Sequence, residues 1–174
     1  MYQISLQPVA NFDRVGETWM ELQERADGSF FQSWAWTGCL AEERFPRPVV
    51  LEARAGANLV AMGLFKMRAK SFGRSMLCLG ESGVADFDAV CIEHNGFGQR
   101  GAPSLLAQCL RAAQSATIGG ARPNRDRTLV LSGVAADHLG AARSLPGIVR
   151  LRAVDPAPFV DLLGIRQSGG VSLA

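Results

Sequence analysis

Side chains that can transfer protons cluster between residues 81 and 95. The candidates are Glu81, Asp86, Asp88, Glu93, His94 and Asn95. Carboxylates and imidazoles are the groups that most often serve in general acid–base catalysis. In an extended chain Asp86 and Asp88 share one face, where they could hold a cation or a hydroxyl-rich substrate, whereas Glu93 and His94 point to opposite faces. A solvated acidic loop is the alternative interpretation of the same segment.

A second candidate site is the segment "GFGQRGAPSLL" at residues 96–106, which leads into an apolar helix. Acetyltransferases of the GNAT type hold the pyrophosphate of acetyl-CoA in a Gln/Arg-x-x-Gly-x-Gly/Ala turn at a helix N-terminus. The candidate cofactor-binding residues are Gln99, Arg100 and Gly101. Ala102 occupies the position that requires glycine, and Pro103 lacks one N–H donor but suits the first turn of a helix. The pattern therefore favours an ordinary loop and helix start, with a degenerate cofactor site as the alternative.

Three further residues have the chemistry of a site but not its pattern. Ser82 stands in "GESG", which does not complete the Gly-x-Ser-x-Gly turn of a serine nucleophile. His138 is expected in the middle of a helix, on a face exposed to solvent. Cys91 and His94 have a metal-like spacing, but no second pair of ligands follows. We therefore expect no metal site.

The composition is that of a globular domain. Of 174 residues, 48% are hydrophobic and 20% are charged, which argues against disorder and for a single domain over residues 1–174. The net charge of +2 and the absence of a basic run give no reason to expect nucleic acid. No apolar stretch approaches the ~20 residues of a membrane span. The four cysteines form no CxxC pair, so we expect reduced core thiols in a cytoplasmic protein.

Hydrophobic periodicity in the first half predicts alternating strands and helices. A strand is expected over residues 2–9, followed by a helix capped by Asn11 and a second helix capped by Ser33. Residues 49–67 alternate around a short turn, which predicts an antiparallel hairpin at the centre of the sheet. Trp34 and Trp36 are expected to fill the core or a domain seam rather than to stack on a sugar.

The second half has the sequence pattern of an α/β crossover, in which helices alternate with strands. A helix starts at Pro103, "TLVLS" at 128–132 reads as a buried strand of the parallel kind, and a helix follows over 134–145. Two more strands are expected over 148–154 and 157–162. The fold class is therefore α/β (α+β), a GNAT-like mixed sheet with an antiparallel meander flanked by helices.

Several segments together resemble the CelD/BcsL-type acyltransferases, a GNAT-like group linked with cellulose and exopolysaccharide biosynthesis. "SFFQSWAWTGCLAEE" is similar to the family's "FF-Q-SPAW" helix, and "GANLVAMGLFKMR" is similar to its long hairpin strand. "MLCLGESG", the acidic segment after it and "PAPFVDL" follow in the family's order. The family's members have two GNAT-like halves, as the Fem-type aminoacyl transferases do. The resemblance covers nearly the whole chain and maps to the N-terminal half.

The resemblance implies an acyl-CoA-dependent N-acetyltransferase or related acyltransferase, whose acceptor is a small molecule or glycan precursor. The segment from Glu81 to Asn95 would form one wall of the acceptor cleft. Acetyl-CoA or another acyl-CoA would be held by the missing C-terminal half, so that this segment alone would be inactive. The alternative is a non-catalytic GNAT-like module for folding and partner contact.

The end of the chain has the character of a fragment. It is apolar and stops at "GGVSLA" without a polar tail. We therefore expect an apolar patch that a C-terminal half would cover. Its contributors would be residues 159–163 and the outward part of the helix that carries Trp34 and Trp36.

Overall fold

The computed structural model describes residues 2–26, 28–70, 74–84, 88, 96–99, 103–118, 127–134 and 136–150. The strands in chain order are β1 (Gln3–Pro8), β2 (Val49–Ala55), β3 (Asn58–Ala69), β4 (Ser75–Leu79), β5 (Gly98–Gln99) and β6 (Thr128–Val130). The helices are α1 (Phe12–Gln23), the short 3-10 helix η1 (Phe30–Gln32), α2 (Trp34–Arg44), α3 (Pro103–Ser115) and α4 (Ala136–Arg143).

The strands form one mixed sheet in the order β1–β2–β3–β4–β6, with the two-residue β5 also paired to β3. Strands β1 to β4 are antiparallel neighbours, and β6 runs parallel to β4. The predicted fold class is confirmed: an antiparallel meander within a mixed sheet, flanked by helices. The predicted central hairpin is confirmed as well, since β2 and β3 pair antiparallel from Val49–Phe65 to Ala55–Asn58.

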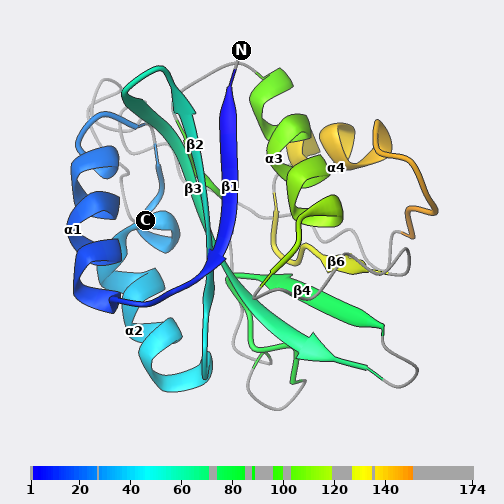
Figure 1. Cartoon of the computed structure of the whole chain (residues 1–174), viewed down its shortest axis with the longest axis horizontal. Helices are drawn as coiled ribbons and strands as arrows, with labels where there is room; N and C mark the ends of the chain where they lie inside the picture. The colour runs from blue at the N-terminus through cyan, green and yellow to red at the C-terminus, as the bar shows by residue number, and fades with distance from the viewer. Residues whose placement is uncertain are drawn as a thin grey trace, which may run out of the picture.

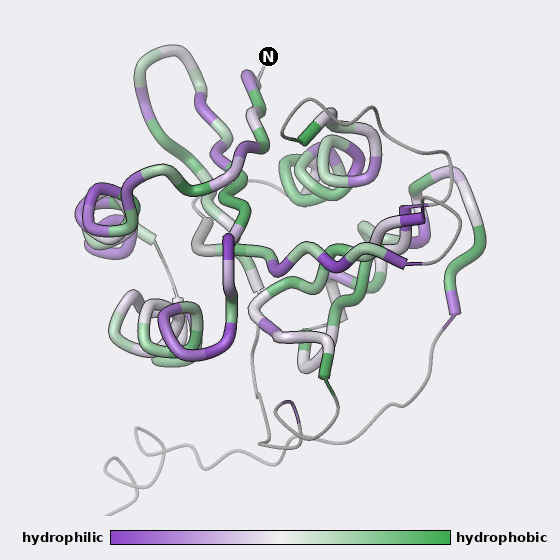
Figure 2. Tube along the Cα trace, turned by 60° about the horizontal axis from the view of Figure 1, so that its bottom comes forward, coloured by the Kyte–Doolittle hydropathy of each residue, from purple (hydrophilic) through white to green (hydrophobic). Residues whose placement is uncertain are grey.

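Helices cover both faces of the sheet (Figure 1). One face packs against α1 and α2 through a cluster that includes Trp19, Leu22, Met62 and Leu64. The other packs against α3 and α4 through a second cluster, built on β-strand residues such as Leu77 and on α3. The outer sides of the helices carry hydrophilic segments, while the strands between the layers are largely hydrophobic (Figure 2). The alternation along β3 thus divides its side chains between two cores.

Local sequence sets where the first two helices begin. The Asn11 side chain accepts a hydrogen bond from the backbone N–H of Arg14 at 3.0 Å, and Ser33 Oγ accepts one from Trp36 N–H at 3.3 Å. Both are the predicted N-caps, and each provides a partner for a helix N–H that has none within the helix. Pro103 is the first residue of α3, as predicted.

The indole of Trp34 fixes the spacing of α1 and α2. It lies between Gly16 of α1 and Gly38 of α2, where an added Cβ would come within 2.6 Å and 2.8 Å of the ring. Its ring also lies 5.0 Å from that of Phe12 and 6.0 Å from that of Trp19, centroid to centroid. The predicted role of Trp34 in the core is confirmed, and the two glycines allow the helices to approach each other.

A buried arginine connects the end of α3 to the sheet. Arg127 is 7% exposed, and its Nη1 donates to the carbonyls of Ala113 at 2.9 Å and Ala116 at 2.7 Å. Its Nε donates to Ser75 Oγ of β4 at 3.3 Å. A cation at a helix C-terminus satisfies carbonyls that have no partner within the helix. Arg127 therefore holds α3 against the start of both β4 and β6.

Three predictions are corrected. His138 is 4% exposed rather than solvated, because α4 turns this residue inward, where its ring stacks on that of Phe97. Cys39 is exposed rather than in the core, because α2 packs through Thr37, Gly38 and Ala41 on its other side. The strand expected over 148–154 does not begin in its described part, where Ile148 is 87% exposed and has no sheet neighbour.

The expected apolar patch at the end of the chain and at the helix of Trp34 and Trp36 can be compared with the structure only in part. Residues 159–163, which were expected to contribute to an apolar patch, lie outside the described residues. Near the start of α2, the rings of Phe30, Phe31 and Trp36 pack on one another, and Phe30 is 62% exposed. Among the described helices, none has the length and hydropathy that crossing a membrane requires.

Replacing Gly38 by alanine is expected to destabilise the fold by about 1–3 kcal/mol, because the new methyl group would overlap the Trp34 ring. Gly140 in α4 is the matched control, since an added Cβ there has no atom within 4 Å. Gly140→Ala should raise stability by about 0.5–1 kcal/mol through helix propensity. Urea unfolding measures both variants. Equal changes in unfolding free energy for the two variants would contradict the close packing of Trp34 against Gly38.

Candidate functional site

The polar residues nearest to a catalytic arrangement lie at the carboxyl ends of two parallel strands. Register pairs Cys78 of β4 with Val130 of β6, so Glu81 and Ser132, which follow these strands, come together. Gly80 makes the turn after β4 with φ 59°, and its N–H donates to Leu64 O at 2.9 Å. The Ser132 hydroxyl donates to the Glu81 carboxylate. The carboxyl ends of parallel strands are where ligands bind in open α/β sheets.

A second carboxylate closes the loop that carries Glu81. Asp88 Oδ1 accepts hydrogen bonds from the backbone N–H of Ser82 at 2.9 Å and from Ser82 Oγ at 2.7 Å. Ser82 Oγ in turn accepts from Val84 N–H at 3.0 Å. Ser82 is 3% exposed, and this network uses its hydroxyl to hold the loop. Asp88 therefore fixes the backbone next to Glu81.

Burial and charge both act on Glu81. The residue is 7% exposed, and this desolvation raises the pKa of its carboxyl. The negative charge of Asp88 raises the pKa further, while the hydrogen bond from Ser132 lowers it. The net pKa is above the ordinary value, so that Glu81 holds a proton more tightly than a solvated glutamate does. We refer to Glu81, Ser82, Asp88 and Ser132 as the β4–β6 cluster.

The thiol beside this cluster is not a nucleophile. Cys78 is fully buried, and an added Cβ at Gly83 of the covering loop would come within 2.8 Å of its sulfur. Burial, and next the charges of Glu81 and Asp88, raise the pKa of the Cys78 thiol to about 11. Only thiolates attack efficiently, so Cys78 is inert at neutral pH.

The structure brings together two of the predicted acceptor-cleft residues, Glu81 and Asp88. Gln99 is placed as part of β5, opposite Ala61 of β3. The other predicted site residues lie outside the described residues: Asp86, Glu93, His94, Asn95, Arg100 and Gly101. Cys91, the other half of the metal-like spacing, lies outside them too. Among the described residues, no group of three His, Cys, Asp or Glu side chains has the geometry of a metal site.

Sequence reasoning missed Ser132 and gave Ser82 no role. The available signal was positional, because Ser132 ends the predicted parallel strand "TLVLS" and therefore falls at the binding edge of the sheet. His138 lies on α4, but its side chain packs against Phe97 and Gly96 and not against the β4–β6 cluster. Its ring stacks on Phe97 at 6.3 Å between centroids, and an added Cβ at Gly96 would lie 2.9 Å from His138 Nε2. That close approach explains why position 96 holds a glycine.

The described start of α3 offers one N–H donor fewer to a pyrophosphate than a helix that begins with another residue. Its first residue is Pro103, which has no N–H to donate. A pyrophosphate site at a helix N-terminus depends on successive N–H groups. Because Arg100 and Gly101 lie outside the described residues, the cofactor site at this end of α3 stays a prediction.

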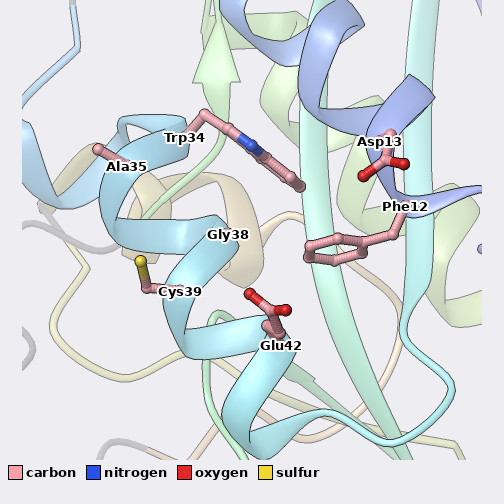
Figure 3. Close-up of a pocket in the computed structure, with 7 residues that line it drawn as sticks. All are labelled: Phe12, Asp13, Trp34, Ala35, Gly38, Cys39 and Glu42. Atoms are coloured by element: carbon pink, nitrogen blue, oxygen red, sulfur yellow. The ribbon is translucent and has the colours of Figure 1, made fainter.

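A separate pocket of about 260 Å³ lies between α1 and α2 (Figure 3). Its walls include the rings of Phe12 and Trp34 and the carboxylates of Asp13 and Glu42. The thiol of Cys39 lies on its outer side, in the view of Figure 3. None of the lining residues belongs to the β4–β6 cluster.

Comparison with known proteins gives no assignment. No family model matches the chain, no curated protein matches it in sequence, and no solved structure matches its fold. Function must therefore be argued from the arrangement of the chain's own residues.

Glu81→Gln should change how stability depends on pH. A carboxyl with a raised pKa binds its proton more tightly in the folded state, so in the native chain stability falls as pH rises from the unfolded pKa through the folded one. Glutamine keeps the hydrogen bond from Ser132 without a charge to desolvate. The urea midpoint of the variant should therefore equal the native one at low pH and exceed it at neutral pH. A constant difference across the range would contradict the raised pKa.

Proposed function

We propose that this chain forms the acceptor side of an acyltransferase that uses acyl-CoA, with the β4–β6 cluster at the acceptor. The observation that carries the proposal is the buried Glu81 beside Ser132, at the carboxyl ends of two parallel strands. The order of elements supports it, since an antiparallel meander leads through α3 to a parallel strand, as in the GNAT-like fold expected from the sequence. The resemblance to the CelD/BcsL-type acyltransferases adds the reaction class.

In this proposal Glu81 removes a proton from the acceptor. An acceptor amine or hydroxyl becomes nucleophilic when it loses its proton, and a carboxylate with a raised pKa is matched to that transfer near neutral pH. The Ser132 hydroxyl orients the Glu81 carboxylate, and Asp88 holds the loop behind it through Ser82. Asp88 also keeps negative charge close to Glu81, which strengthens its hold on the proton.

The proposed acyl donor is acetyl-CoA or another acyl-CoA, bound outside this chain by a C-terminal GNAT-like half. The absence of an N–H on Pro103 supports this division. The proposed acceptor is a small molecule or a glycan precursor, in the context of cellulose or exopolysaccharide synthesis. The proposed location is the cytoplasm, which accords with the free thiols of Cys78 and Cys109.

The test measures release of the CoA thiol from acetyl-CoA by the complete gene product, over a panel of amino and hydroxyl glycan precursors. Glu81→Gln is expected to lower kcat by about 10²–10⁴-fold, which is the usual contribution of a general base. Glu17, an exposed carboxylate on α1, provides the control variant Glu17→Gln. Unchanged kcat in Glu81→Gln would reject Glu81 as the base.

The alternative is a non-catalytic module for folding and partner contact. The exposed Phe30, with Phe31 and Trp36 packed beside it, is the observation that favours it. Exposed aromatic side chains are typical of interaction surfaces. In this case, acyl transfer by the complete gene product would not respond to Glu81→Gln, but it would fall when Phe30 is replaced by serine.

A further inference from the structure

The face of β3 that packs under α1 and α2 changes character where the strand leaves that layer. Met62 and Leu64 are in the core, and the next side chains on the same face are Lys66 and Arg68, while Lys70 follows directly after the end of the strand at Ala69. Lys66 is half-buried, while Arg68 and Lys70 are exposed. These are the only two lysines of the chain, whose other basic residues are all arginines. Three cations therefore follow one another along the last part of β3 and just beyond its end.

A fourth cation joins them at the cost of backbone strain. Arg47 has φ 59°, and among the described residues it is the only non-glycine in the left-handed region. The turn that holds it is fixed by Lys66 Nζ, which donates to Pro46 O at 2.8 Å. Left-handed backbone in an ordinary residue is unfavourable and is concentrated at functional sites. Arg47, Lys66, Arg68 and Lys70 together are called the basic ridge.

The ridge has excess positive charge. Desolvation, and next the charges of Arg68 and Arg47, lower the pKa of Lys66. Among the described residues, ion pairs join Arg44 to Glu43 and Arg54 to Glu52, and none involves the ridge. Like charges held close together repel one another, and a bound anion relieves that repulsion.

The ridge borders the loop that carries the β4–β6 cluster. The Arg68 guanidinium donates to Gly83 O, and an added Cβ at Gly83 would lie 3.0 Å from Arg68 Cδ. Lys66 pairs with Cys78 across β3 and β4, on the face that this loop covers. A ligand on the ridge would therefore lie next to Glu81, which is two residues from Gly83.

We propose that the basic ridge binds the diphosphate group of a small-molecule substrate. Arginine forms paired hydrogen bonds to phosphate oxygens, and lysine binds phosphate as a point charge. Successive side chains on one strand face are ~6.8 Å apart, twice the rise per residue, so one phosphate cannot neutralise the whole ridge. A diphosphate carries charge over a longer span. The inference does not depend on the proposed acyl transfer, because binding is measured without an acyl donor.

The first test titrates inorganic pyrophosphate into the complete chain by calorimetry at low salt. The double variant Arg47→Gln with Lys70→Gln is expected to bind at least about tenfold more weakly, and added salt should weaken native binding through screening. The matched control removes two exposed arginines from helices, Arg14→Gln with Arg111→Gln, and should bind as the native chain does. Equal losses in both double variants would show a general charge effect and overturn the site.

Arg47→Gly separates binding from folding. Glycine adopts φ 59° without strain, so this variant should unfold at a higher urea concentration and yet bind pyrophosphate several-fold more weakly. A merely structural role for Arg47 would not give that combination. Higher stability with unchanged binding would exclude Arg47 from the site.

The last test needs no substitution and so does not depend on variants that fold. Reductive methylation of the native chain labels Lys66, Lys70 and the N-terminal amine, which serves as the internal reference. Pyrophosphate should slow labelling of both lysines relative to that reference, as read by mass spectrometry. Protection by vesicles of phosphatidylglycerol but not by pyrophosphate would assign the ridge to a membrane surface and contradict the proposal. Protection by neither would also contradict it.

Discussion

The parallel pairing of β4 with β6 is the constraint on which the rest of the structure depends. Two parallel strands cannot be joined by a tight turn. The chain therefore crosses one face of the sheet through α3 and returns as β6 beside β4. The register, with Met76 opposite Thr128 and Cys78 opposite Val130, then brings Glu81 and Ser132 side by side. The buried carboxyl of Glu81 therefore lies at the carboxyl ends of β4 and β6 as a consequence of this pairing.

Arg127 secures the return of the crossover. It precedes β6 and joins the last carbonyls of α3 to Ser75, so that one side chain sets where the helix ends and where both parallel strands start. Burial lowers the pKa of its guanidinium, yet the hydrogen bonds keep the charge satisfied. On the opposite face, Trp34 between Gly16 and Gly38 sets the α1–α2 layer. The helices thereby hold the sheet on both faces. The loop after β4 covers Cys78 of the sheet beyond the α1–α2 layer.

The elements were predictable where local rules decide them, whereas of the candidate site only Glu81 and Asp88 were predicted. Asn11, Ser33 and Pro103 start helices through capping and backbone geometry, and the alternation over 49–67 specifies a hairpin, although not the register shift between Ala53 and Arg54. His138 could not be placed, because α4 has only eight residues and its apolar and polar residues do not separate clearly into two faces. Ser132 contacts Glu81 across fifty residues of sequence, through strand register alone. The basic ridge could not be predicted from the overall charge of +2. Its residues alternate with apolar ones along the chain and do not form a basic run.

Glu81 is held at the ends of β4 and β6 with a raised pKa, on which its proposed role as a proton acceptor depends. The most direct measurement is the titration of its side-chain carboxyl carbon by NMR in the ¹³C-labelled chain, with assignment by Glu81→Gln. We expect a midpoint above the ordinary value of a glutamate, and a downward shift of that midpoint when Asp88→Asn removes the neighbouring charge. A midpoint at the ordinary value, unmoved by Asp88→Asn, would contradict it.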